Sequence, residues 1–262
     1  MSTESGEAIL SSVSQGVATI TLNAPERKNA LAPSLVASLH DALNQAMGDE
    51  DVRVIVLTNT GNTFCAGADL ASAKPGVAPT SDGPSFVDVF KTIFDGPKPV
   101  VGRIDGHATG GGVGLVAACD ISVMRDDAKI GFTEVRIGVA PAIISVACLP
   151  KMSRAHASEL FLTGERFTPH RAAEVGLINR AVGAGELDGV VNTYLAMLMR
   201  GGPDALAASK ELVRRVPTMD RDSAFEWTAK RSAELFLTDE ARAGIAAFRG
   251  RQDAPWVPQQ WK

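Results

Sequence analysis

The sequence predicts an α/β core followed by a helical C-terminal region. Strand-like and helix-like stretches alternate up to about residue 132, whereas only helical periodicity is found from residue 153 onward. A strand–turn–helix unit also occurs twice, at 52–70 and at 100–118. The composition changes at Gly201-Gly202-Pro203, so we expect a core domain at 1–200 and a helical region at 201–262.

Each element follows from a local pattern. Residues 8–23 alternate apolar and polar side chains around Ser14-Gln15-Gly16, which is typical of a β-hairpin. Apolar runs predict further strands at 52–58, 98–104, 121–124 and 129–132. Apolar residues at helical spacing predict helices at 34–47, 86–94, 112–118, 155–162, 169–175, 187–200, 203–216, 223–237 and 239–248. The Ala, Pro, Ser and Gly content of 71–84 indicates a surface loop able to close over a ligand.

Composition narrows the class of protein. The 262 residues are 45% hydrophobic and 21% charged, with a net charge of −4, which disfavours nucleic acid or an anionic membrane as a partner. Three cysteines without regular spacing favour neither a disulfide framework nor a zinc site, so no metal is expected. No export signal or membrane-spanning segment is recognisable, so we expect a soluble, cytoplasmic protein.

Two glycine-rich turns are the most informative feature. Phe64–Leu70 (FCAGADL) and Asp105–Gly112 (DGHATGGG) each follow a strand pattern. Glycines leave backbone N–H groups bare, and two such groups directed at one oxygen form an oxyanion hole. The pair of turns therefore predicts chemistry on a carbonyl group.

Other interpretations of the glycines remain open. Three consecutive glycines also permit close packing of a helix on a sheet. Residues 112–117 loosely match a dinucleotide fingerprint, but the acidic residue expected about twenty positions later is not evident. No segment matches a phosphate-binding loop or a serine nucleophile elbow. We expect His107 and Cys65 to have packing roles.

The turns belong to longer segments that carry a family resemblance. FCAGADL, DGHATGGGVGLVAACDISV and AKIGFTEVRIGVAP occur in this order, flanked by similar segments at 27–31, 161–164 and 238–248. Together they resemble the enoyl-CoA hydratase/isomerase (crotonase) superfamily, over essentially the whole chain. The resemblance implies a crotonase-like spiral of ββα units, a C-terminal helical trimerisation region and an acyl-CoA thioester substrate. Coenzyme A is part of that substrate, so no separate cofactor is implied.

The matching motifs also imply roles for individual residues. The oxyanion donors would be the backbone N–H groups of Ala68 and Gly111. The coenzyme A contacts would come from two segments near the first turn, from the second turn and from a segment near the C-terminus, including contacts across a subunit boundary: Arg27, Lys28, Ala66, Ala68, Leu70, Gly111, Phe248 and Arg251. The family often has Lys where this chain has Arg251.

The acid and base positions distinguish branches of the family. Two-carboxylate hydratases have a Glu three residues after the middle glycine of GGG, where this chain has Gly114. Their second Glu matches Glu134. Glu134 would then act alone, as general base and then as general acid. The removed charge and side chain at Gly114 predict space for a bulkier acyl group.

These assignments lead to three functional hypotheses. The first is an enoyl-CoA hydratase, a lyase, that resembles the methylglutaconyl-CoA hydratase-like branch, whose members act on branched or carboxylated acyl groups. The second is an isomerase that converts 3-enoyl-CoA to 2-enoyl-CoA, and the third is a non-catalytic acyl-CoA-binding homologue. A homotrimer or homohexamer is expected because the C-terminal part is rich in apolar residues: Leu195, Leu198, Leu206, Leu212, Phe225, Trp227, Leu235 and Phe236.

Overall fold

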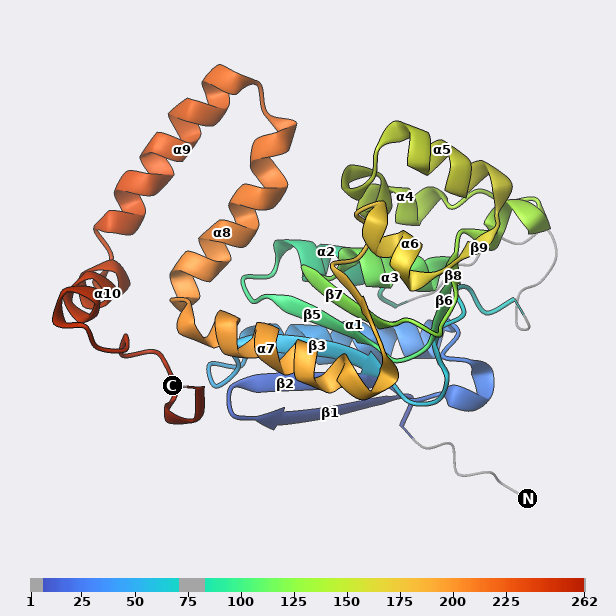
Figure 1. Ribbon diagram of the computed structural model, residues 1–262, viewed down its shortest axis with the longest axis horizontal. Coiled ribbons are helices and arrows are strands. Elements are labelled where there is room, and N and C mark those ends of the chain that lie inside the picture. The colour runs from blue at the N-terminus through green and yellow to red at the C-terminus, as the bar shows by residue number, and fades with distance from the viewer. Residues whose placement is uncertain (1–6, 71–82, 262) are drawn as a thin grey trace.

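The structure, a computed structural model, describes residues 7–70 and 83–261. Two mostly parallel sheets and the helices that cover them form the body of the protein, and a pair of long helices extends from it (Figure 1). The α/β fold class is confirmed. The ligand-covering loop expected at 71–84 lies, up to residue 82, outside the described residues.

The larger sheet has six strands in the order β1-β2-β3-β5-β7-β10. Their bounds are β1 (Ile9–Ser14), β2 (Val17–Leu22), β3 (Val54–Asn59), β5 (Val100–Ile104), β7 (Ile121–Arg125) and β10 (Arg180–Val182). β1 and β2 form the expected antiparallel hairpin, and the other neighbours are parallel. Gln15 and Gly16 both have positive φ (54° and 80°), which matches the turn to the twist of the flanking strands.

The smaller sheet has four short strands in the order β4-β6-β8-β9. They are β4 (Thr63–Cys65), β6 (His107–Thr109), β8 (Ile130–Gly131) and β9 (Arg166–Phe167). β4, β6 and β8 are parallel to one another. The sequence predicted that the glycine turns directly follow the strands at 52–58 and 98–104. This was wrong, because the short strands β4 and β6 come between those strands and the glycines at 67 and 110–112. Strands of three residues are too short to show an alternating pattern.

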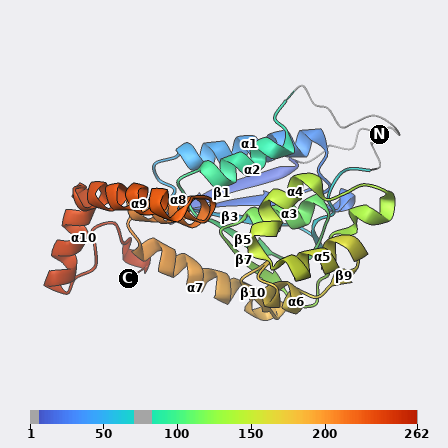
Figure 2. The same ribbon diagram turned by 90° about the horizontal axis from the view of Figure 1, so that it is seen from above.

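The core has two layers, one on each face of the larger sheet. On one face pack α1 (Pro33–Gly48), α2 (Phe86–Asp95) and α3 (Gly111–Ala118), and on the other packs α7 (Leu187–Arg200), as Figure 2 shows. Along β3, Ile55 and Leu57 join the first layer whereas Val54 and Val56 join the second. Because both faces of this strand are buried, its first four residues, 54–57, are all apolar.

Three shorter helices surround the smaller sheet: α4 (Ala142–Cys148), α5 (Arg154–Thr163) and α6 (Pro169–Glu174) (Figure 1). The last two agree with the expected ranges. The helix α4, the 3₁₀ turn Thr133–Ile137 and the strands β9 and β10 had no counterpart among the expected elements. All are short, and their formation depends on packing against the rest of the core.

The C-terminal helices are α8 (Pro203–Arg215), α9 (Arg221–Phe236) and α10 (Asp239–Gly250). Among their described residues only Ala208 is buried. The aromatic side chains Phe225 and Phe236 are each 69% exposed, whereas Leu195 belongs to the core of the main body. Arg53 links this region to the sheet by donating to the carbonyl oxygens of Gly201 (2.7 Å) and Trp256 (2.9 Å). The division at residue 200 stays a prediction.

Asn29 fastens the segment that precedes α1. It is fully buried with a φ of 50°, and its Oδ1 accepts from the Ala24 N–H at 2.7 Å. Its Nδ2 donates to the carbonyl oxygens of Thr60 (3.1 Å) and Thr63 (2.8 Å). One side chain therefore holds this segment against the strand that carries the first glycine turn.

We expect Asn29→Ala to lower the free energy of unfolding by about 3 kcal/mol, because three hydrogen bonds are lost and buried backbone groups are left unpaired. Urea denaturation measures this change. Asn192→Ala, on the exposed face of α7, is the matched control and should change stability by less than about 0.5 kcal/mol. Equal stabilities for the two variants would contradict the fastening role.

Candidate active site

The two glycine turns lie side by side. They follow β4 and β6, which pair in parallel with Thr63 opposite His107 and Cys65 opposite Ala108. Gly67 has a φ of +87°, and a Cβ on it would lie 2.8 Å from the Thr109 oxygen and 3.0 Å from the Gly111 nitrogen. Only glycine permits this approach, so the backbones of the two turns are in direct contact.

Two backbone donors are available where the turns meet. Gly111 is the first residue of α3, where N–H groups have no partner inside the helix and the helix dipole favours negative charge. In the described part of the chain, the N–H groups of Ala68 and Gly111 donate to no protein acceptor. A Cβ on Gly112 would lie 2.2 Å from the Cys65 oxygen, so the start of α3 is pressed against the end of β4.

Glu134 reaches the same place from a third strand. It lies in the 3₁₀ turn that follows β8, the parallel neighbour of β6, and its carbonyl oxygen accepts from the Val139 N–H at 3.2 Å. Its Oε1 lies 3.5 Å from the position of a Cβ on Gly110. The carboxyl ends of three consecutive parallel strands thus bring together the two turns and one carboxylate.

The carboxylate of Glu134 is half-buried and incompletely paired. Burial raises the pKa of Glu134 above its ordinary value of 4.5. Its Oε2 is buried, and among the described residues no group is within hydrogen-bond distance of it. A buried carboxylate oxygen without a protein partner is suited to bind a water or a substrate proton.

The structure differs from the expectation at Gly114. The missing carboxylate leaves no open space, because a Cβ on Gly114 would lie 2.4 Å from Ile144 Cγ2 and 2.9 Å from Phe90 Cζ. Both side chains are almost fully buried. The predicted room for a bulkier acyl group at this position was therefore wrong.

The segment with Arg27 and Lys28 lies against the first glycine turn. The Lys28 carbonyl oxygen accepts from the Ala66 N–H at 3.0 Å, and Arg27 forms an ion pair with Asp69. Both basic side chains are exposed, and Leu70 is 59% exposed. The structure therefore brings five of the expected coenzyme A residues to one surface: Arg27, Lys28, Ala66, Ala68 and Leu70.

Phe248 and Arg251 are not part of this surface in the same chain. Phe248 lies in the last turn of α10 and Arg251 directly follows this helix, and Figures 1 and 2 both show α10 far from α3. Phe248 is 84% exposed. These residues could contact a bound coenzyme A only from a second copy of the chain.

Some residues with structural roles in the site were missed or only partly recognised. Thr109 Oγ1 donates to the Ala66 carbonyl oxygen at 3.1 Å and so joins the two turns. His107 Nδ1 accepts from the Lys129 N–H at 2.9 Å, which supports the expected packing role. Cys65 is fully buried, and burial raises the pKa of its thiol to about 12, as befits a packing residue.

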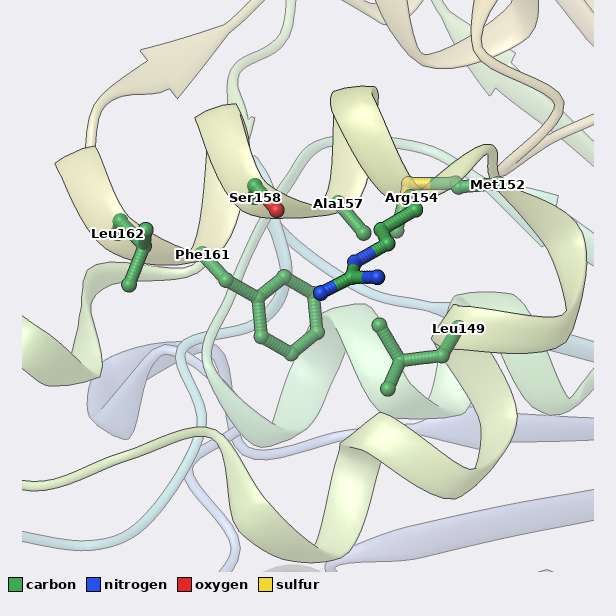
Figure 3. Close-up of a pocket in the computed structure, with 7 residues that line it drawn as sticks. All are labelled: Leu149, Met152, Arg154, Ala157, Ser158, Phe161 and Leu162. Carbon is green, nitrogen blue, oxygen red and sulfur yellow. The ribbon is translucent and has the colours of Figure 1, made fainter.

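A separate pocket lies away from the glycine turns. Figure 3 shows a pocket of about 420 Å³ along α5, with Phe161 and Leu149 at its walls and Arg154 reaching across it. It contains none of the expected site residues, and no Asp or Glu is among its lining residues. The glycine turns therefore stay the candidate active site.

Two further searches cover residues 7–70 and 83–261. Within these ranges no three or more His, Cys, Asp or Glu side chains gather in a way that could hold a metal ion. No helix in the same ranges has the length and apolar character needed to cross a bilayer.

Comparison with known proteins identifies the family. The family model described as enoyl-CoA hydratase/isomerase matches residues 12–259. A Thermus thermophilus protein is 34% identical over 237 residues, which cover 88% of this chain and 94% of that protein. A carnitinyl-CoA dehydratase of Salmonella paratyphi A is 31% identical over 244 residues, covering 90% of this chain and 93% of that protein. The crystal structure of an enoyl-CoA hydratase of Mycobacterium smegmatis is 30% identical, covers 97% of this chain and 100% of that chain, and has a TM-score of 0.88.

The fold is that of the crotonase superfamily. The chain belongs to the enoyl-CoA hydratase/isomerase family. The resemblance of the sequence motifs to this superfamily is thus confirmed, and the branch within it stays a prediction.

We expect Gly67→Ala to lower kcat/KM by about 100-fold or more, because the added methyl group would push the Ala68 and Gly111 donors apart. Steady-state kinetics on an enoyl-CoA, normalised to folded protein by circular dichroism, measures the effect. Gly189→Ala is the control, since a Cβ at this exposed position of α7 meets no atom within 4 Å. Unchanged kinetics in Gly67→Ala would show that the contact between the turns is dispensable.

Proposed function

We propose that this protein is an enoyl-CoA hydratase that works with a single carboxylate. The observation that supports the proposal is the buried, unpartnered Oε2 of Glu134 beside two bare backbone N–H groups. Hydration of a 2-enoyl thioester needs both parts: donors for the oxygen that becomes negative and a base for water.

The proposed mechanism assigns one task to each group. The thioester oxygen accepts hydrogen bonds from the N–H groups of Ala68 and Gly111. Glu134 removes a proton from water, the water oxygen bonds to C3, and the C2–C3 π electrons move to form an enolate. The enolate oxygen is stabilised by the two donors, each worth about 3 kcal/mol. Glu134, now protonated, returns its proton to C2 and is regenerated as a carboxylate.

The coenzyme A portion is proposed to bind along the first turn. Arg27 and Lys28 would approach the phosphates, and the backbone at Ala66, Ala68 and Leu70 would hold the adenine and pantetheine. No cofactor beyond the substrate's own coenzyme A is proposed. The Arg27–Asp69 ion pair supports this placement because it holds one cation at the edge of the turn.

Glu134→Gln is expected to lower kcat/KM for hydration by about 10²–10⁴-fold, because the amide can neither accept nor return a proton. Loss of the conjugated enoyl thioester absorbance measures the rate. Glu165→Gln is the matched control, since Glu165 is an exposed carboxylate that pairs with Arg136. Activity in Glu134→Gln equal to that of the control would remove Glu134 from the mechanism.

The pH profile gives a second readout of the same residue. The base must be ionised, and burial places its pKa above 4.5. The value of kcat/KM should therefore fall as the pH is lowered through that raised pKa, and the acidic limb should be absent from the residual activity of Glu134→Gln.

Isomerisation is the second candidate, and one observation favours it. Carboxylates were expected at two positions. Ile144 and Phe90 fill the space at Gly114, so only the other position, Glu134, carries an acid or base. One carboxylate suffices to move a proton from C2 to C4 of a 3-enoyl thioester. Incubation in deuterated water separates the two: hydroxyacyl product indicates hydration, and a shifted, deuterated enoyl product indicates isomerisation. Tight acyl-CoA binding without either product would favour a non-catalytic binding protein.

We further propose that the chain works as a homotrimer or homohexamer in which α10 of a neighbouring copy completes the coenzyme A site. The absence of buried residues in α9 and α10 among those described supports this assembly. Phe248→Ala is expected to raise KM for acyl-CoA about tenfold while changing kcat little, because a contact with the nucleotide part acts on binding. Sedimentation velocity gives the oligomeric state, and a stable monomer with full activity would overturn the assembly.

A further inference from the structure

Two segments of the chain pass from the larger sheet to the smaller sheet side by side. Residues 60–62 connect β3 to β4, and residues 105 and 106 connect β5 to β6. β3 is parallel to β5, and β4 is parallel to β6, so both connections run in the same direction. We call these two connections the crossover. Gly67 and Gly110 follow the ends of β4 and β6 by two residues or fewer, so the crossover determines where the glycine turns begin.

The crossover changes the register between the two neighbouring strands. Leu57 pairs with Gly102 in the larger sheet, and Thr63 pairs with His107 in the smaller sheet. Thr63 is six positions after Leu57, whereas His107 is only five positions after Gly102. A slip of one residue between paired strands turns every side chain to the opposite face. This offset must therefore be held fixed if the two glycine turns are to meet.

The side chain of Asn59 joins the two connections. Asn59 is the last residue of β3 and is buried. The Asp105 N–H donates to Asn59 Oδ1 at 3.1 Å, and Asn59 Nδ2 donates to the Asp105 carbonyl oxygen at 3.0 Å. Asn59 Nδ2 also donates to the Gly61 carbonyl oxygen at 3.1 Å. One amide group therefore pairs with three backbone groups and holds both connections of the crossover.

Asp105 is also held by two arginines. Its Oδ2 accepts from Arg103 Nη1 at 3.0 Å, and its Oδ1 accepts from Arg125 Nη1 at 2.9 Å. These arginines belong to β5 and β7, which are neighbours in the larger sheet. Asp105 is thus fixed to the larger sheet through its side chain, and Asn59 fixes its backbone to the end of β3.

The backbones of the two connections are in direct contact. Gly106 has a φ of +148°, and a Cβ on it would lie 2.3 Å from the Asn62 carbonyl oxygen. The His107 N–H donates to the same oxygen at 3.0 Å. Because there is no free space between the connections, a shift of Asp105 relative to Asn59 would also move the starts of β4 and β6 relative to each other.

We propose that Asn59 is a positioning residue for the two oxyanion donors. Its amide fixes the offset between β4 and β6, and this offset sets how the N–H groups of Ala68 and Gly111 are placed relative to each other. In this role Asn59 acts through the backbone of Asp105 and not through contact with a substrate. The role rests on the proposed function, because it takes the thioester oxygen to bind between the two donors.

Loss of the Asn59 amide should impair the reaction more than binding. The enolate needs both donors at hydrogen-bond distance, whereas the coenzyme A portion is proposed to bind along the first turn. A small misplacement of groups that contact the reacting atoms costs up to about 100-fold in rate. Asn59→Ala should therefore lower kcat by about 10- to 100-fold while changing KM by less than about threefold.

Infrared difference spectroscopy reports on the donors without any turnover. Butanoyl-CoA labelled with carbon-13 at the thioester carbon is saturated, so the proposed reaction cannot consume it. Fixed donors polarise a bound carbonyl group more strongly than water does, which lowers its stretching frequency. We expect this shift when the labelled thioester binds to the wild-type protein, and we expect Asn59→Ala to lose at least half of it.

The matched control removes a similar hydrogen bond elsewhere in the same sheet. Asn179 Oδ1 accepts from the Ser122 N–H at 2.8 Å, where β7 pairs with β10. Asn179→Ala should keep the wild-type kcat and carbonyl shift. Asn59→Ser is a smaller change in the same direction and serves if Asn59→Ala does not fold. Circular dichroism and urea denaturation show that each variant is folded under the conditions of the assay.

Two results would overturn the positioning role. The first is a folded Asn59 variant that keeps the wild-type carbonyl shift, whether or not its kcat falls, because Asn59 would then not act through the donors. The second is an equal loss of kcat and of the shift in Asn179→Ala, because the effect would then follow from lower stability alone.

The outcomes also separate this role from the proposed function. If Asn59→Ala loses the carbonyl shift but the wild-type protein hydrates no enoyl-CoA, the hydratase proposal fails while the positioning role holds. If hydration is observed and Asn59→Ala keeps both kcat and the shift, the positioning role alone fails. If the wild-type protein shows no carbonyl shift, the donors do not bind the thioester oxygen and both fail.

Discussion

The contact between two glycine turns is the constraint on which the rest of the site depends. Gly67 and Gly111 approach so closely that a side chain on either would meet backbone or core atoms. This approach requires β4 and β6 to be parallel neighbours, and it requires α3 to begin at the edge of β4. Asn29 supports this geometry by holding the start of β4 through its hydrogen bonds to the carbonyl oxygens of Thr60 and Thr63. The bare N–H groups that result are costly to bury unless an oxygen binds them.

The second constraint is the isolation of Glu134. A half-buried carboxylate with one oxygen unpartnered has a raised pKa, so it is a stronger base than an exposed glutamate. In a site with two carboxylates, charge repulsion would help to raise one of these pKa values. Here desolvation alone does so. Ile144 and Phe90 fill the space beside Gly114, so a second acidic side chain has no room at that position.

Long periodic elements could be predicted from the sequence, and short ones could not. The hairpin, α1 and α7 matched their expected ranges because each repeats its pattern over many residues. β4, β6 and α4 were missed because three to seven residues carry no resolvable period. The segments with Arg27, Ala68 and Gly111 are neighbours in the structure, and the roles of these residues stay predictions. The contact of Ile144 with Gly114 could not be predicted, because it joins residues thirty positions apart through the packing of two helices.

The position of Phe248 and Arg251, far from the glycine turns, could not be predicted from the sequence either. It has a physical consequence for assembly. A motif shows which residues belong to a family's site, but it does not show whether one chain or two supply them. In this chain α9 and α10 present phenylalanines at 69% and 84% exposure, while Arg27 and Lys28 stand exposed beside the first turn. An exposed apolar surface of this kind favours association with a second copy. If α10 of that copy covers the Arg27–Lys28 segment, binding of coenzyme A and subunit association become coupled, so that acyl-CoA should stabilise the oligomer by mass action.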